Sequence, residues 1–165
     1  MKIIKNILFV CTGNTCRSPI AEYIFREFIK DRGLEDKWNI QSAGVSAVNG
    51  SKINEKAKTV MDEISIDTSD HRSKNIKDID LDRQNLILTM TRKHSRVLIL
   101  NYPTCADNTF TLKEYTGSET EKDISDPFGR SVDFYRETRK EIEVELKKLL
   151  KMIDKFDNYE KEKKQ

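Results

Sequence analysis

One stretch near the N-terminus restricts the fold of this chain more than any other. Apart from Lys5 and Asn6, residues Ile3–Val10 are apolar, and four of them are β-branched, which is typical of a parallel strand covered on both faces. The loop CTGNTCR follows, and then Ser18 as a helix N-cap with Pro19 at the first helical position. Apolar residues recur at helical spacing from there to Gly33. The pattern predicts a strand, a loop and a helix in that order.

Strand and helix patterns continue to alternate along the chain. Further strands are expected at 38–43, 85–90 and 109–112, and further helices at 53–64, at 92–100 and from Val132 onward. Alternation of this kind predicts an α/β fold, a single-domain parallel sheet with helices on both faces. A chain of 165 residues suits one domain. We expect this domain to span 1–154, and a polar tail, 155–165, either to continue the last helix into solvent or to fray.

Charge and hydropathy argue against two classes of partner. Lys and Arg number 30 against 28 Asp and Glu, so the net charge is +2, and the basic residues are dispersed. Nucleic acid is therefore not expected as a partner. An apolar window of membrane-spanning length and a signal-peptide pattern are both missing, so we expect a soluble cytoplasmic protein that does not bind membranes. In such a reducing compartment the three cysteines are expected to be free thiols.

The loop after the first strand combines a nucleophile with an anion site. A helix N-terminus offers free backbone N–H groups and a positive dipole end to an oxyanion. The ATP-binding pattern is absent, because Gly13 has no partner glycine five positions on and no Lys precedes Ser18. Cys11 and Arg17 are present instead. The surroundings favour a thiolate, and a guanidinium can hold two phosphate oxygens, so we predict a phosphate-binding loop with phosphoryl transfer to sulfur.

A proton donor for the leaving group is expected in the segment SDPFG. Asp126 precedes Pro127, which restricts the Asp backbone to extended conformations. The ring of Phe128 is expected to form a wall of the substrate slot, with Val48 and Asn49 on the other side. The alternative is that Asp-Pro-x-Gly only builds a turn.

On these residues the chain resembles the low-molecular-weight protein phosphatase family, through Cys-x5-Arg-Ser at 11–18 and the late Asp126-Pro127, with SAG at 42–44 and LTMT at 88–91. The resemblance implies a two-step mechanism without metal or cofactor, with Cys11 as nucleophile, Arg17 as phosphate ligand and Asp126 as acid and then base. It also implies that Ser18 stabilises the thiolate and that Asn14 braces the loop. The implied phosphate-binding residues are Thr12, Gly13, Asn14, Thr15, Cys16, Arg17 and Ser18.

Within the family, the chain is most similar to the bacterial branch that acts on phosphoarginine, through CTGNTCRSP, FTLKEY at 110–115 and DPFG. Tyrosine-directed members usually carry an aliphatic residue at the position of Thr15. Our hypothesis is that the Thr15 hydroxyl suits a guanidinium leaving group, and that Thr15 and Phe128 determine specificity; Thr15 as mere loop filler is the alternative. Arg130 departs from the second glycine of related bacterial sequences.

The resemblance implies phosphorylated proteins as substrates, inorganic phosphate or a similar oxyanion in the site, and a monomer. Some family members form a disulfide in this loop, so a reversible Cys11–Cys16 disulfide is one alternative, and Cys16 as a small side chain at the helix start is the other. Cys11, Cys16, His71 and His94 lack the spacing of a zinc site. We expect His71 at the surface or as a cap, with loop orientation as the alternative, and His94 facing solvent.

Three other functions fit parts of the pattern. A tyrosine phosphatase of the same family differs only in substrate preference. An arsenate reductase needs further cysteines in the middle of the chain, and between Cys16 and Cys105 there are none. A phosphate-dependent binding module without chemistry is disfavoured by the presence of Cys11, Arg17 and Asp126 together.

Overall fold

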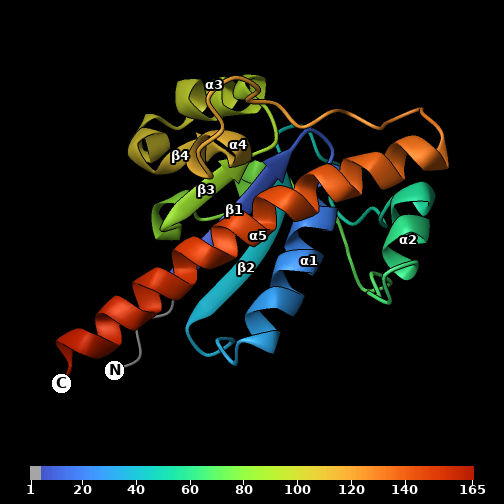
Figure 1. Cartoon of the computed structure of the whole chain (residues 1–165). Helices are drawn as coiled ribbons and strands as arrows, with labels where there is room; N and C mark the ends of the chain where they lie inside the picture. The colour runs from blue at the N-terminus through green and yellow to red at the C-terminus, as the bar shows by residue number, and fades with distance from the viewer. Residues whose placement is uncertain (1–4) are drawn as a thin grey trace.

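The computed structural model describes residues 5–165, so residues 3 and 4 of the first expected strand lie outside the described part. Figure 1 shows strands and helices alternating along the chain. The strands are β1 (Lys5–Cys11), β2 (Trp38–Gly44), β3 (Leu86–Thr89) and β4 (Thr109–Thr111). The helices are α1 (Arg17–Asp31), α2 (Glu55–Asp62), α3 (Arg92–Asn101), α4 (Leu112–Tyr115) and α5 (Val132–Lys163). Short 3-10 turns occupy Ile76–Asp78, Leu81–Arg83 and Pro103–Asn108.

The four strands form one sheet in the order β2-β1-β3-β4, and all three pairings are parallel. Cys11 is paired with Gly44, and Val10 with Thr89. The carboxyl ends of β1, β2 and β3 therefore meet at one edge, which is where ligand sites form in open parallel sheets.

Both faces of the sheet are covered, which confirms the predicted fold class. Ile7 and Phe9 of β1 pack in one apolar cluster with residues of α1 and α5, and these two helices lie together on that face (Figure 1). Leu8 and Val10 point to the other face, where they meet Leu98 of α3 and a second cluster. This alternation follows from the period of two along a strand.

The last helix is longer than the sequence pattern indicates. α5 begins at Val132, as expected, and runs to Lys163, so the boundary expected after residue 154 falls inside one helix. Asp157 is buried, and its two carboxylate oxygens bind Lys37 at 2.6 Å and Lys161 at 2.8 Å. Residues 155–163 thus continue the helix instead of fraying.

The other expected elements lie within one to three residues of their predicted bounds. α2 is shorter than the expected 53–64, because the side chain of Asn54 caps it by accepting from the backbone N–H of Lys56 and Ala57. Among residues 5–165, the structure holds no helix that is both long and apolar enough to cross a membrane.

Candidate active site

Cys11 is the last residue of β1, and its thiol lies under the loop that leads into α1. The side chain is buried, its sulfur is 2.9 Å from the hydroxyl of Ser18, and the backbone N–H of Asn14 donates to the sulfur at 3.3 Å. The loop therefore wraps around the sulfur with donors pointing inward, an arrangement that stabilises a thiolate.

Ser18 is not the helix N-cap that the sequence pattern predicts. α1 begins at Arg17, two residues before the predicted first helical residue Pro19, and Cys16 occupies the N-cap position without a side-chain cap hydrogen bond. Instead of capping, the Ser18 hydroxyl turns inward to Cys11 and accepts from the side-chain amide of Asn14 at 2.9 Å. The Ser18 hydroxyl thus contacts Cys11 instead of capping α1.

Asn14 occupies the centre of the loop in the left-handed backbone region, with φ 56°, which Asn tolerates better than most residues. Its side-chain amide also donates to Ser42 at 2.8 Å, and its side-chain oxygen accepts from the backbone of Lys74 at 2.9 Å. With the contact to Ser18, three polar contacts fix the fully buried side chain, and the backbone is fixed by two more, to Cys11 and His71. This geometry fits the bracing role that the family resemblance implies.

His71 is buried, so the expectation of a surface or capping position is wrong. Its Nε2 lies 2.7 Å from the carbonyl oxygen of Asn14, and burial lowers its pKa. Ser42, which accepts from Asn14, donates in turn to the buried carboxylate of Glu22 at 2.5 Å. The alternative, in which His71 orients the loop, fits these contacts. Sequence spacing alone offers no signal for Glu22.

Arg17 lies buried between the loop and the segment that carries Asp126. One guanidinium nitrogen donates to the carbonyl oxygen of Ile124 at 3.1 Å, and another lies 3.6 Å from a carboxylate oxygen of Asp126. The Asp126 side chain is 59% exposed, and it accepts from the backbone N–H of Phe128 at 3.1 Å. Asp126 therefore lies at the solvent-exposed edge of the loop.

Cys11, Arg17 and Asp126 line one cavity of about 260 Å³, together with Thr12, Gly13, Thr15, Cys16 and Phe128. Phe128 is 70% exposed and forms a wall at the opening. Val48 and Asn49 are not among the lining residues, contrary to expectation. Asn49 binds Asp78 and Asn75 instead, at 2.7 Å each.

Cys16 faces the core as well as the cavity. Its sulfur is 3.4 Å from the hydroxyl of Tyr135, a fully buried residue of α5. Burial raises the pKa of Cys16, so this thiol stays protonated at neutral pH. All three cysteines are free. The periodicity of α5 predicts that Tyr135 lies on the core face, but it does not predict the contact of Tyr135 with the cysteine loop.

His94 is also buried, so the prediction of a solvent-facing side chain is wrong. Its Nε2 lies 2.8 Å from the Thr12 hydroxyl and its Nδ1 lies 3.0 Å from that of Thr91, the N-cap of α3. Burial, helped by the positive charge of Arg17, lowers the pKa of His94 to about 4. The first turn of α3 faces the loop across the edge of the sheet, which brings this side chain inward.

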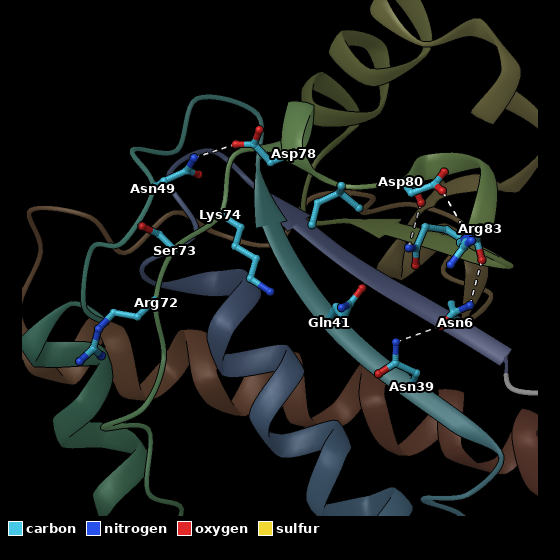
Figure 2. Close-up of a pocket in the computed structure, with 12 residues that line it drawn as sticks. Asn6, Asn39, Gln41, Asn49, Arg72, Ser73, Lys74, Asp78, Asp80 and Arg83 are labelled. Atoms are coloured by element: carbon cyan, nitrogen blue, oxygen red, sulfur yellow. Dashed lines mark hydrogen bonds and ion pairs between the residues drawn. The ribbon is translucent and has the colours of Figure 1, made fainter.

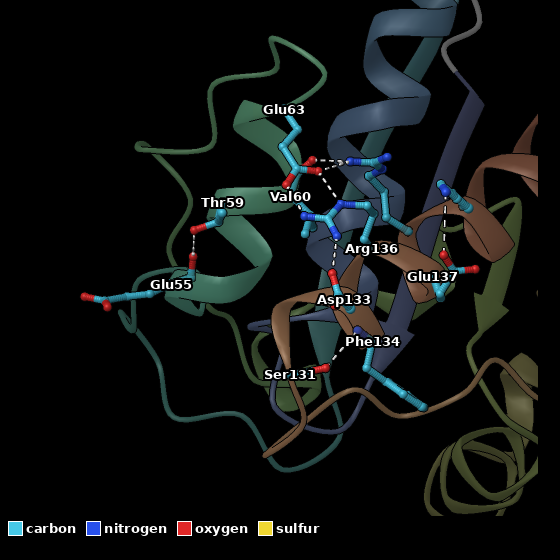
Figure 3. A network of polar contacts seen from close by, with 11 residues as sticks. Glu55, Thr59, Val60, Glu63, Ser131, Asp133, Phe134, Arg136 and Glu137 are labelled. Carbon is cyan, nitrogen blue, oxygen red and sulfur yellow. Dashed lines mark hydrogen bonds and ion pairs between the residues drawn. The ribbon is translucent and has the colours of Figure 1, made fainter.

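Charged side chains fasten α2 to α5 (Figure 3). The carboxylate of Glu63 binds Arg136 through two contacts, at 2.6 and 2.9 Å, and Arg139 at 3.1 Å. Arg139 also donates to the carbonyl oxygen of Val60 at 2.6 Å, and Arg136 binds Asp133 at 2.5 Å. A guanidinium that binds both oxygens of a carboxylate fixes orientation as well as distance.

The other end of α2 reaches the candidate site. The backbone N–H of Asn54 donates to the carbonyl oxygen of Thr15 at 2.9 Å, and Lys56 donates to that of Arg130 at 2.5 Å. The Arg130 guanidinium lies over the ring of Phe134, 4.5 Å from its centre, and Arg130 does not line the Cys11 cavity. Arg130, which stands where related bacterial sequences have a second glycine, therefore contacts α5 outside the cavity.

A larger depression, of about 590 Å³, lies over β2 (Figure 2). Its lining is polar, with an Asn6–Asn39 hydrogen bond at 2.9 Å and an Arg83–Asp80 ion pair at 3.3 Å. The lining residues described there include no cysteine or histidine. We therefore assign the chemistry to the smaller cavity. Within residues 5–165, no group of three or more His, Cys, Asp and Glu is arranged to hold a metal ion.

Comparison with known proteins agrees with this geometry. The family model described as low molecular weight phosphotyrosine protein phosphatase matches residues 6–159. A protein-arginine-phosphatase of Bacillus subtilis (strain 168) is 40% identical over 151 residues, which cover 91% of this chain and 97% of the relative. The low molecular weight protein-tyrosine-phosphatase Ptp of Acinetobacter johnsonii is 36% identical over 134 residues, covering 81% of this chain and 87% of the relative.

A solved structure of a mutant YwlE arginine phosphatase with a phosphorylated active-site serine superposes with a TM-score of 0.85. It is 37% identical, and the match covers 91% of this chain and 96% of that one. With its cysteine loop, its late Asp-Pro and its four-stranded parallel sheet, the chain belongs to the low molecular weight phosphotyrosine protein phosphatase family.

Proposed function

We propose that this protein is a cysteine-dependent protein phosphatase that removes phosphate from arginine side chains. The observation that carries the proposal is the single cavity in which a buried thiol, a fixed guanidinium and a rim carboxyl converge, formed by Cys11, Arg17 and Asp126. Relatives named as arginine phosphatases, 40% identical over nearly the whole chain, support the choice of substrate.

The geometry suits transfer in two displacements. The Cys11 thiolate attacks phosphorus, the P–N bond of phosphoarginine breaks, and the carboxylic proton of Asp126 passes to the departing nitrogen. Water then attacks the phosphocysteine and gives a proton to the Asp126 carboxylate, and the S–P bond breaks to release inorganic phosphate and the thiolate. Arg17 and the loop amides hold the non-bridging oxygens in both steps.

Thr15 is our candidate for selectivity. It lines the cavity, and its hydroxyl lies 3.8 Å from the Cys16 sulfur, a long contact that leaves the group able to meet a substrate. A hydroxyl can hydrogen-bond a polar guanidinium leaving group, whereas an aliphatic side chain would pack against a phenyl ring. Phe128 lines the same cavity and is our second candidate for selectivity, as a wall of the substrate slot.

The second candidate function is phosphotyrosine hydrolysis. A relative named as a tyrosine phosphatase is 39% identical over 135 residues, and the exposed ring of Phe128 can stack on a phenyl group. The catalytic steps are the same with a P–O bond in place of the P–N bond, so only substrate preference separates the two functions.

For either function we propose a cytoplasmic monomer that takes phosphorylated proteins as substrates, needs no metal or cofactor, and binds neither nucleic acid nor membranes. The net charge of +2 with dispersed basic residues supports the absence of nucleic acid binding. Light scattering on the purified protein tests whether it is a monomer in solution.

The deciding experiment compares phosphoarginine and phosphotyrosine in peptides of one sequence at neutral pH. We expect the native protein to prefer phosphoarginine, Thr15→Ile to reverse the preference, and Cys11→Ser to be inactive. Thr15→Val keeps the size and removes only the hydroxyl, so it shows whether hydrogen bonding carries the preference. A native preference for phosphotyrosine establishes the second function, and turnover by Cys11→Ser contradicts the mechanism.

A further inference from the structure

The first turn of α3 touches both halves of the active site. On one side, His94 contacts the hydroxyl of Thr12, the residue after the nucleophile. On the other side, the backbone N–H of Arg92 donates to the Asp123 carboxylate at 2.8 Å, three residues before Asp126. The adjoining Met90 carbonyl accepts from the backbone N–H of Ile124 at 2.8 Å. One helix turn thus holds the cysteine loop and the acid segment together.

We propose that His94 is a positioning residue of the phosphate-binding loop, which it fixes through Thr12 to the helix turn that also holds the acid segment. The inference rests on the proposed function, since it concerns the same site. His94 does not line the cavity and acts only through Thr12.

Two features make this contact more than core packing. Thr12 is exposed, so water could satisfy its hydroxyl, yet that hydroxyl lies 2.8 Å from a histidine nitrogen that is itself buried. The backbone of Thr12 is held too, because its carbonyl accepts from the N–H of Ser46 at 2.9 Å. The beginning of the loop is therefore held from two sides, by the segment after β2 and by α3.

The protonation state of His94 suits this role. With its pKa lowered to about 4, the ring is neutral at working pH, so one nitrogen donates and the other accepts. Its contacts with Thr12 and Thr91 use both nitrogens. A neutral ring also adds no second positive charge beside Arg17, the residue that is proposed to bind the phosphate.

The test uses His94→Phe, which keeps a ring but no hydrogen bond, and His94→Gln, which keeps an N–H donor. Calorimetric titration with inorganic phosphate is combined with turnover of the preferred substrate. We expect His94→Phe to weaken phosphate binding about tenfold and to lower kcat/KM at least as much, the loss of about one hydrogen bond to a held group. His94→Gln should recover most of both.

A double-mutant cycle separates positioning from packing. Thr12→Val should reproduce the loss, and adding His94→Phe to it should cause little further loss, because one contact has already been removed. Ser95→Ala serves as the matched control: it removes a 2.6 Å contact with Thr89 in the same turn and leaves Thr12 untouched.

The outcomes are distinct. Native phosphate affinity in His94→Phe, or fully additive losses in the double variant, overturns the proposal. If His94→Phe does not fold, Thr12→Val and His94→Gln still decide, because Thr12→Val with native phosphate affinity overturns it as well. Failure of the native protein to turn over either substrate rejects the proposed function, while the phosphate titrations still test His94.

Discussion

The Ser18 hydroxyl lies 2.9 Å from the Cys11 sulfur and also 2.9 Å from the side-chain amide nitrogen of Asn14. Because the amide donates, Ser18 accepts from Asn14, and its single proton can go to the sulfur at 2.9 Å or to the carbonyl oxygen of Ala43 at 3.4 Å. The sulfur is the nearer acceptor, so the Ser18 hydroxyl can hydrogen-bond to a thiolate.

Ser18→Ala should therefore make Cys11 less reactive. We expect alkylation by iodoacetamide at pH 6 to slow and kcat to fall by roughly tenfold, in line with the loss of one hydrogen bond to a charged group, about 1.5 kcal/mol. Ser69→Ala, an exposed change away from the loop, is the control. An alkylation rate equal to that of the native protein would contradict a hydrogen bond from Ser18 to the thiolate.

Asp126→Asn should slow poor leaving groups more than good ones, because only a poor leaving group needs a proton as it departs. We expect about a 100-fold loss with phenyl phosphate and a much smaller loss with p-nitrophenyl phosphate in the first step, measured as burst kinetics. Equal losses with both substrates would show that the 59% exposed carboxyl does not act as the acid.

Gly44→Ala should disrupt the cysteine loop through a steric clash. A Cβ at Gly44 would lie 2.5 Å from the carbonyl oxygen of Thr12 and 2.8 Å from the backbone nitrogen of Asn14, and neither backbone atom can move freely. We expect a destabilisation of about 1–3 kcal/mol, seen as a lower melting temperature, together with weaker phosphate binding. Gly13→Ala is the steric control, since its Cβ would meet nothing nearer than Thr15 at 3.7 Å; equal melting temperatures for the two variants would refute the clash.

Glu63→Gln should loosen α2 from α5. The neighbouring Arg136 holds the pKa of Glu63 down at about 2, so the carboxylate is charged at every working pH. The neutral amide loses the charge-assisted contacts with Arg136 and Arg139, and amides of α2 should exchange hydrogen faster. Glu55→Gln, on the same helix but turned away from the network (Figure 3), is the control. Unchanged exchange would mean that apolar packing alone holds α2.

Stability should fall as the pH is lowered from about 6.5 to about 4. The pKa of His94 is depressed from 6.5 to about 4 by burial, so in this window the unfolded chain takes up a proton that the native protein does not. His71, whose pKa is also lowered, acts in the same sense. Denaturant unfolding at pH 7 and pH 4.5 measures the effect. His94→Gln should reduce the difference, and an unchanged difference would assign it to other groups.

Much of the fold follows from local patterns in the sequence. The apolar period along α5 and the strand before the cysteine loop predict both elements, because their packing repeats with the period of the backbone. α5 continues past residue 154, the predicted end of the domain, and Lys37, far away in the sequence, pairs with Asp157 in this last part of the helix. No local pattern contains such a contact.

The candidate site, like the fold, can be predicted from the sequence only in part. Cys11, Arg17 and Asp126 lie in motifs that can be recognised in the sequence, and in the structure they line one cavity. The sequence predicts a surface or capping position for His71 and a solvent-facing one for His94, because an isolated histidine in a polar stretch shows no periodicity. Their partners, Asn14 and Thr12, lie 57 and 82 positions away in the chain, and only the folded sheet edge brings them within reach.

The Arg17 guanidinium donates to the Ile124 carbonyl, and Asn14 is likewise fixed from several sides, so groups of the chain itself hold both side chains. The loss of rotational freedom of these side chains therefore occurs when the chain folds. An arriving oxyanion has mainly to replace water, so its binding should involve little change in heat capacity and almost no movement of the loop. As a ligand of the native state alone, phosphate should also protect the protein against unfolding, by an amount that keeps growing with the logarithm of its concentration once the site is filled.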